Sequence, residues 1–83
     1  MKYKVMIVED QTMPRELFEL RIQASEHFEV ALSIDNAALA DVYCLRFPVD
    51  LILMDVVTRN GESGLDAAER IKRAFPQIKI IIV

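Results

Sequence analysis

Cysteine is almost absent from the sequence, because Cys44 is the only one among 83 residues. A single cysteine excludes an intrachain disulfide and a zinc site built from several cysteines. A lone cysteine in a folded chain usually serves as a small apolar side chain and is among the most buried residue types. We therefore predict that Cys44 lies in the core.

Long hydrophobic runs are also missing. The apolar stretches are all much shorter than the roughly 20 residues that a membrane-spanning helix needs. The N-terminal sequence MKYKVMIVED has neither the extended apolar region nor the small-residue cleavage site of a signal peptide. These absences favour a cytoplasmic protein with no membrane segment.

Glycine, histidine and clustered basic residues are scarce as well. No G-x-G-x-x-G motif follows the first apolar run, and this disfavours a dinucleotide-binding fold. The single histidine, His27, has no partner nearby in the sequence and is predicted to lie at the surface. The net charge is −3, and the one basic cluster, residues 70–73, falls in a predicted helix with a solvated face. Nucleic-acid binding by this segment is therefore not expected.

The residues that are present suit one small folded domain. Hydrophobic residues make up 53% of the chain and charged residues 28%, which excludes a disordered chain. Short runs rich in Val and Ile alternate with segments of helical periodicity. The predicted strands cover residues 3–8, 28–34, 50–55 and 78–83, and the predicted helices cover about 14–25, 36–47 and 64–75. The order βαβαβαβ predicts an α/β fold, a doubly wound parallel sheet with the strand order 2-1-3-4.

Periodicity and capping residues predict how the helices start and which faces they bury. Asp35 or Asn36 is a suitable cap for the second helix, and Pro14 suits the first turn of the first. The predicted buried faces comprise Leu17, Leu20 and Ala24 with Phe18 and Ile22 beside them, then Ala38, Val42 and Leu45, and then Leu65, Ala68, Ile71 and Phe75.

The last apolar run, IKIIIV, coincides with the end of the sequence. A parallel strand normally has cover on both faces, and an exposed edge strand tends to pair with another chain. We therefore expect a C-terminally truncated domain that self-associates through the edge of its fourth strand.

Three carboxylates stand directly after two of the apolar runs. Glu9 and Asp10 follow the first strand, and Asp55 ends the third. With the order 2-1-3-4 these strands are neighbours about 4.8 Å apart, so the three acids converge at the carboxyl ends of the strands, where open α/β sheets bind ligands. Mg²⁺ prefers such oxygen ligands, and an aspartate beside it can act as a nucleophile toward phosphorus. The alternative is that the acids merely start loops or cap helices.

Four segments together resemble the receiver domains of two-component response regulators, which have a flavodoxin-like fold. They are VMIVED (residues 5–10), DLILMD (50–55), SGLDAAERIKRAFP (63–76) and IKIIIV (78–83). The resemblance implies that residues 1–83 form the N-terminal two thirds of such a domain, without strand five and the last two helices. It also implies that Asp55 receives a phosphoryl group from a histidine kinase or phosphotransfer protein. The implied Mg²⁺ ligands are Glu9, Asp10, Asp55 and the backbone carbonyl of Val57.

The sequence departs from the receiver pattern in three places. Met13–Pro14 is uncommon at the first helix, although its position is compatible with a helix start. The segment VVTRNGESG replaces the usual Met-Pro after the acceptor and is about one residue longer. The Thr or Ser that ends strand four and the Lys that ends strand five have no counterpart in these 83 residues. We therefore expect this chain to be an impaired phosphorylation switch, although its parent domain works as one.

Two other functions remain open on these residues. One is a receiver-like interaction module that is never phosphorylated. The other is a haloacid-dehalogenase-like phosphotransferase, which also uses an aspartate at a strand end but needs a second aspartate where this chain has Val57. A DNA-binding output domain, if the parent has one, lies outside this segment. The receiver reading predicts a signalling module and not an enzyme.

Overall fold

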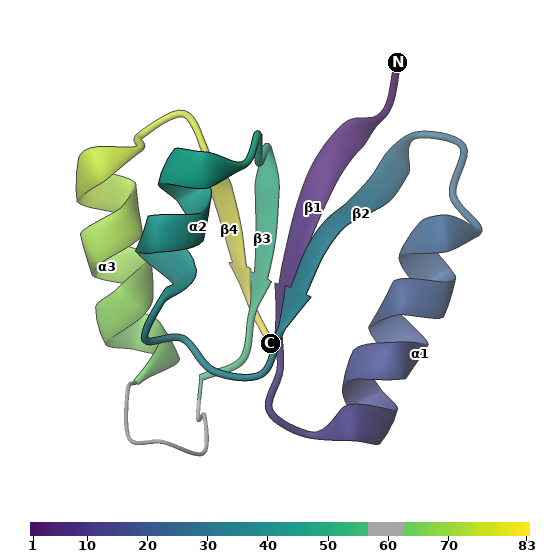
Figure 1. Cartoon of the computed structure of the whole chain (residues 1–83), viewed down its shortest axis with the longest axis horizontal. Helices are drawn as coiled ribbons and strands as arrows, with labels where there is room; N and C mark the ends of the chain where they lie inside the picture. The colour runs from purple at the N-terminus through teal and green to yellow at the C-terminus, as the bar shows by residue number, and fades with distance from the viewer. Residues whose placement is uncertain (57–62) are drawn as a thin grey trace.

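The computed structural model describes residues 1–56 and 63–83, and in these two ranges strands and helices alternate along the chain (Figure 1). The strands are β1 (Tyr3–Val8), β2 (Phe28–Ile34), β3 (Leu51–Met54) and β4 (Lys79–Ile82), and the helices are α1 (Thr12–Gln23), α2 (Ala40–Arg46) and α3 (Gly64–Ala74). Each predicted strand is present, with its ends within one residue of the prediction.

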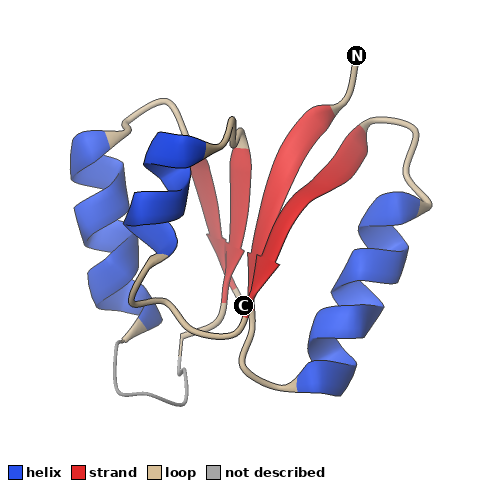
Figure 2. Ribbon diagram, in the orientation of Figure 1, coloured by secondary structure: helices blue, strands red, loops and turns tan. Residues whose placement is uncertain are grey.

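The four strands form one parallel sheet in the order β2-β1-β3-β4. Helix α1 covers one face of the sheet, and α2 and α3 cover the other (Figure 2). This is the doubly wound, flavodoxin-like arrangement that the element order predicted. All four strands end at the same edge of the sheet, and the register places Val8 beside Ile34 of β2 and Met54 of β3. The residues that follow β1 and β3 are therefore neighbours.

The pairing of β1 with β2 contains one irregularity. Val5 lies opposite Val30, but Met6 lies opposite Leu32, so Ala31 is an extra residue on β2. A bulge of this kind interrupts the alternation of side chains between the two faces of a strand. It explains why apolar and polar residues alternate only loosely over residues 28–34 of the sequence.

The core lies between the sheet and the pair α2 and α3. Its buried members come from β1, β3, the two helices and the segments just before α2 and β4: Met6, Val8, Ala37, Ala40, Cys44, Ile52, Met54, Ala67, Ile71 and Ile78. The predicted burial of Cys44 is confirmed, since only 8% of its surface is exposed. The helices among the described residues are too short or too polar to span a lipid bilayer.

The predicted buried face of α1 is correct only in part, and that of α2 is wrong. Leu17 and Leu20 of α1 are 51% and 64% exposed, whereas the neighbouring Phe18 and Ile22 are half-buried. The helix is rotated so that Glu19 also faces the sheet, where its carboxylate accepts a hydrogen bond from the hydroxyl of Ser33 on β2 (3.2 Å). Tertiary contacts here decide the orientation of a helix that is apolar on more than one side.

The predicted start and face of α2 differ from the structure for a related reason. Asn36 caps a turn that precedes the helix, its side-chain oxygen accepting from the N–H of Ala38 (2.9 Å), and α2 itself begins at Ala40. In the helix that starts there, Ala40 and Cys44 are buried in the core, whereas Val42 and Leu45 are exposed. In α3, Ile71 is buried as predicted. Leu65 was also predicted to be buried but is exposed, and Ala67 is buried instead.

Candidate functional site

Three carboxylates meet at the carboxyl ends of the two central strands. One oxygen each from Glu9, Asp10 and Asp55 can be chosen so that all three lie within 4.8 Å of one another. Glu9 is buried, and the two aspartates are half-buried. The structure thus brings together the three side chains that the sequence singled out.

Backbone hydrogen bonds extend the sheet just far enough to hold these acids. The N–H of Asp55 donates to the carbonyl of Val8 (2.9 Å), and the N–H of Glu9 donates to the carbonyl of Ile34 (3.0 Å). Glu9 and Asp55 therefore each lie where a strand is still hydrogen-bonded to its neighbour, and Asp10 follows Glu9 directly. The cluster is built on the sheet, which makes its geometry more precise than that of a site on loops alone.

Burial dominates the electrostatics of Glu9. Loss of solvation raises the pKa of the Glu9 carboxyl above its ordinary value of 4.5, and the nearby Asp55 and Asp10 carboxylates raise it further. The N–H of Gln11, 3.4 Å from Glu9 Oε1, opposes this shift. A group whose charged form is disfavoured in this way gains from a cation that neutralises the cluster.

The donor set fits a magnesium ion. Mg²⁺ binds oxygen ligands at about 2.1 Å in an octahedron, so adjacent ligands lie about 3.0 Å apart and opposite ligands about 4.2 Å apart. The three carboxylate oxygens lie within 4.8 Å of one another, so inward rotation of the side chains by one to two ångströms, about the difference between 4.8 and 3.0 Å, would bring them to these separations. Three carboxylates without nitrogen or sulfur ligands favour a hard cation over zinc or copper. Val57, whose carbonyl was predicted as a further ligand, lies outside the described residues.

Gly64, the first residue of α3, packs against the backbone of Asp55, the predicted phosphoacceptor. The side chain of Ser63 caps this helix by accepting from the N–H of Leu65 (3.1 Å). The N–H of Gly64 donates to the carbonyl of Val56 (2.8 Å). A β-carbon at position 64 would overlap the carbonyl oxygen of Asp55, so this approach requires glycine.

Two residues near the acids were not singled out by the sequence analysis. One is Gly64, which was read only as the start of a helix although glycine is scarce in the chain. The other is Arg15, whose guanidinium Nη1 donates to the carbonyl oxygen of Glu9 (3.0 Å). A cation so close to the positive end of a helix is unfavourable without a specific partner, and this feature of the sequence was overlooked.

Comparisons with known proteins agree with this geometry. The family model described as the response regulator receiver domain matches residues 5–83. Over 80 residues, the chain is 30% identical to the oxygen regulatory protein NreC of Staphylococcus haemolyticus; the match covers 96% of this chain and 37% of that protein. The chain thus spans well under half the length of this curated relative.

Solved structures with the same arrangement include two response regulators. The receiver domain of PhyR from Erythrobacter litoralis is 25% identical, with a TM-score of 0.85, and the match covers 98% of this chain and 61% of that one. The RcsB response regulator of Salmonella typhimurium, from a structure concerned with conformational dynamism for DNA interaction, has a TM-score of 0.87 at 17% identity; the match covers 98% of this chain and 41% of that one.

Proposed function

Since the chain belongs to the response regulator receiver domain family, we propose that it takes a phosphoryl group from the phosphohistidine of a histidine kinase or phosphotransfer protein onto Asp55. As a receiver domain the chain is a signalling module of a two-component system and not an enzyme with a substrate of its own. The observation that carries the proposal is the meeting of Glu9, Asp10 and Asp55 within 4.8 Å. The proposal includes a cytoplasmic location, where kinases have access to ATP.

The acids have different tasks in this proposal. A carboxylate oxygen of Asp55 attacks phosphorus as the phosphorus–nitrogen bond of the donor breaks, and the electron pair leaves with the imidazole nitrogen, which takes up a proton. Glu9 and Asp10, with Asp55 and the carbonyl of Val57, would hold Mg²⁺. The ion supplies neutralisation of the charge on the transferring phosphoryl group, which is the main electrostatic requirement of this reaction.

Phosphorylation of the chain by a small-molecule phosphodonor tests this assignment. With Mg²⁺ present, intact-mass measurement is expected to show the addition of one phosphoryl group, and peptide mapping should place it on Asp55. The Asp55→Asn variant and a sample treated with a chelator serve as controls and should show no addition. If neither the donor nor a phosphorylated kinase modifies the wild-type chain, the interaction-module reading replaces the proposal.

The 83 residues are further proposed to act as an impaired switch. We infer that they correspond to the N-terminal two thirds of a receiver domain, and the incomplete coverage of the PhyR receiver domain supports this. The family's Thr or Ser and Lys, which bind the phosphoryl group, have no counterpart here. The modification is therefore expected to be partial and short-lived, and complete, lasting phosphorylation would contradict this expectation. Any contact with DNA would come from an output domain outside these residues.

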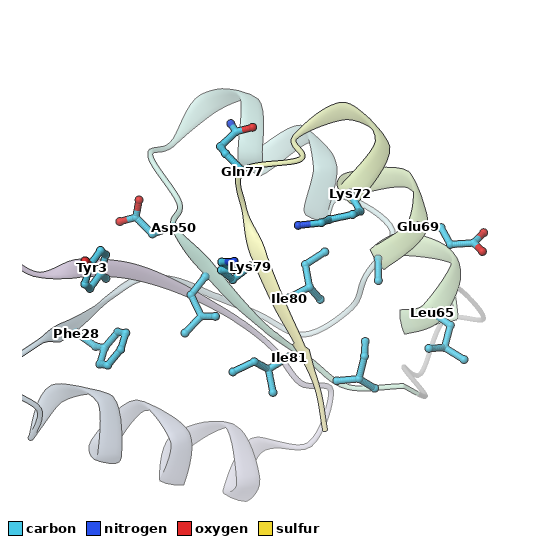
Figure 3. A pocket seen from close by; sticks show the side chains of 13 residues that line it. Tyr3, Phe28, Asp50, Leu65, Glu69, Lys72, Gln77, Lys79, Ile80 and Ile81 are labelled. Atoms are coloured by element: carbon cyan, nitrogen blue, oxygen red, sulfur yellow. The ribbon is translucent and has the colours of Figure 1, made fainter.

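The outer edge of β4 supports a proposal about partners. Within the described residues, β4 pairs only with β3, and Ile81 is 49% exposed. Figure 3 shows side chains from β1, β2, α3 and β4 around a groove along this strand, among them Tyr3, Phe28, Leu65 and Ile81. An apolar edge of this kind is a template for strand pairing.

We infer that a second copy of the chain occupies this edge. Antiparallel pairing about Ile81 would place Lys79 opposite Val83 of the other copy, so no two like charges would lie directly opposite one another. Light scattering should report a dimer, and Ile81→Lys should convert it to a monomer. Leu45 of α2 is also exposed but does not line the groove, so Leu45→Lys is the matched control. A monomeric wild-type chain at high protein concentration would overturn this inference.

A further inference from the structure

We infer that Arg15 is a positioning residue for the acid cluster, an inference that rests on the proposed Mg²⁺ site. Its guanidinium Nη1 donates to the carbonyl oxygen of Glu9 (3.0 Å). That carbonyl belongs to the peptide group that joins Glu9 to Asp10. Arg15 therefore holds the one peptide plane whose rotation changes the relative direction of these two carboxylates.

The other side of Glu9 is held as well. Its N–H donates to the carbonyl of Ile34 at the end of β2 (3.0 Å). The backbone of Glu9 is thus anchored on one side by the sheet and on the other by a side chain of α1. Without the guanidinium, the sheet would still hold the N–H, but the peptide leading to Asp10 would lose its partner.

The placement of Arg15 is unfavourable unless this contact compensates for it. The residue lies close to the N-terminus of α1, where the helix dipole disfavours a cation. It is half-buried and forms part of the wall of a polar cavity of about 360 Å³, together with Ser33, Asp35 and Asn36. Among the described residues, the guanidinium makes this one hydrogen bond.

Positioning and simple electrostatics predict opposite effects on metal binding. Removing a positive charge near the acids would by itself strengthen Mg²⁺ binding, because less repulsion opposes the ion. Removing an anchor would weaken it, because the carboxylates lose their relative orientation. Partners behind metal ligands commonly contribute tenfold or more to affinity. The sign of the change therefore separates the two roles.

The test compares Arg15→Gln with Arg21→Gln, which removes the same charge from an exposed position on the same helix. Mg²⁺ affinity is measured by calorimetry, and hydrogen exchange of the Asp10 amide is followed by NMR without metal. Arg15→Gln should weaken Mg²⁺ binding about three- to tenfold and speed exchange at Asp10. Arg21→Gln should change neither the Mg²⁺ affinity nor the exchange rate at Asp10. Arg15→Lys keeps the charge and a hydrogen-bond donor, so both quantities should lie between those of wild type and Arg15→Gln.

The two measurements keep this inference separate from the proposed function. Tighter Mg²⁺ binding by Arg15→Gln with unchanged exchange at Asp10 would overturn the positioning role and leave only a charge effect. If the wild-type chain takes up no Mg²⁺, the proposed site fails. In that case the exchange at Asp10 still decides whether Arg15 holds the peptide, and unchanged exchange would overturn the inference.

Discussion

The α-carbon of Gly64 lies directly against the backbone of Asp55. A β-carbon built at position 64 would overlap the Asp55 carbonyl oxygen and would lie 2.8 Å from the carbonyl carbon. The obstacle is backbone, which cannot move aside as the end of a flexible side chain can. The start of α3 therefore depends on glycine, and the position of α3 is linked to that of the proposed phosphoacceptor.

The Gly64→Ala substitution is expected to destabilise the chain and disturb the acid site. Relief of the overlap requires movement of α3 or of the end of β3, and overpacking of this kind typically costs about 1–3 kcal/mol in free energy of unfolding. Chemical denaturation measures that loss, and Mg²⁺ affinity should fall with it. Glu69→Ala, an exposed substitution on the same helix, is the control. Equal stability of Gly64→Ala and wild type would show that the contact is not as close as described.

Mg²⁺ should stabilise the folded chain, because it binds a site that only the folded state forms. Ligand at about 100 times its dissociation constant adds about 2.7 kcal/mol to the free energy of unfolding. Thermal melts at increasing Mg²⁺ should therefore show a rising midpoint. In Asp10→Asn the dependence of the midpoint on Mg²⁺ should be much weaker, because one of the three carboxylate ligands is lost. A wild-type midpoint that does not respond to Mg²⁺ would contradict the metal site.

The pH dependence of stability should follow the raised pKa of Glu9. The folded chain holds this proton more tightly than the unfolded chain, whose carboxyl titrates near its ordinary value of 4.5. Without metal, the free energy of unfolding should therefore fall as the pH rises from that value through the folded pKa. Mg²⁺ affinity should rise over the same range, because the carboxylate must lose its proton to bind.

Glu9→Gln provides the control for that pH dependence. The variant has no proton to lose at this position, so its melting midpoint should be flatter across this pH range and higher than that of wild type at neutral pH without metal. Its Mg²⁺ affinity should be low. A wild-type stability that rises with pH in this range would argue that another group dominates.

Cys44 should resist alkylation until the chain unfolds. Burial raises the pKa of its thiol from 9.0 to about 11, and the Asp41 carboxylate adds to the shift. Because the thiolate is the reactive species, this lowers its equilibrium fraction at mildly alkaline pH about 100-fold. Iodoacetamide labelling followed by mass spectrometry should be slow in buffer and fast in denaturant. Rapid labelling of the folded chain would indicate that the core around α2 opens readily.

The architecture could be predicted from the sequence because parallel strands are continuous apolar runs. The run 3–8 is followed directly by acids and the run 50–55 ends in one, and the sheet order alone then brings Glu9 and Asp55 together. The burial of individual residues was harder to predict from the sequence. The apolar residues of α1 occupy more than one side of the helix, so periodicity could not decide between Leu17 and Phe18, and the structure buries Phe18 more deeply.

The supporting contacts of the site could not be derived from local patterns. The approach of Gly64 to Asp55 depends on how α3 docks on the sheet, and the bond from Arg15 to Glu9 depends on the path of the chain between β1 and α1. Both are consequences of tertiary packing. Each contact nevertheless corresponds to a weak signal in the sequence. For the first the signal is the rare glycine at position 64, and for the second it is the cation Arg15 near a helix N-terminus.

The pairing of β1 with β3 also has a consequence for folding. Val8 and Met54 are neighbours in the sheet but far apart along the chain, and closing such a long loop is slow because its entropy is lost before the contacts form. Asp10 and Asp55 meet only once that pairing is complete, so the ion contributes little to the transition state if the central strands pair late. We expect Mg²⁺ to slow unfolding while leaving the folding rate nearly unchanged.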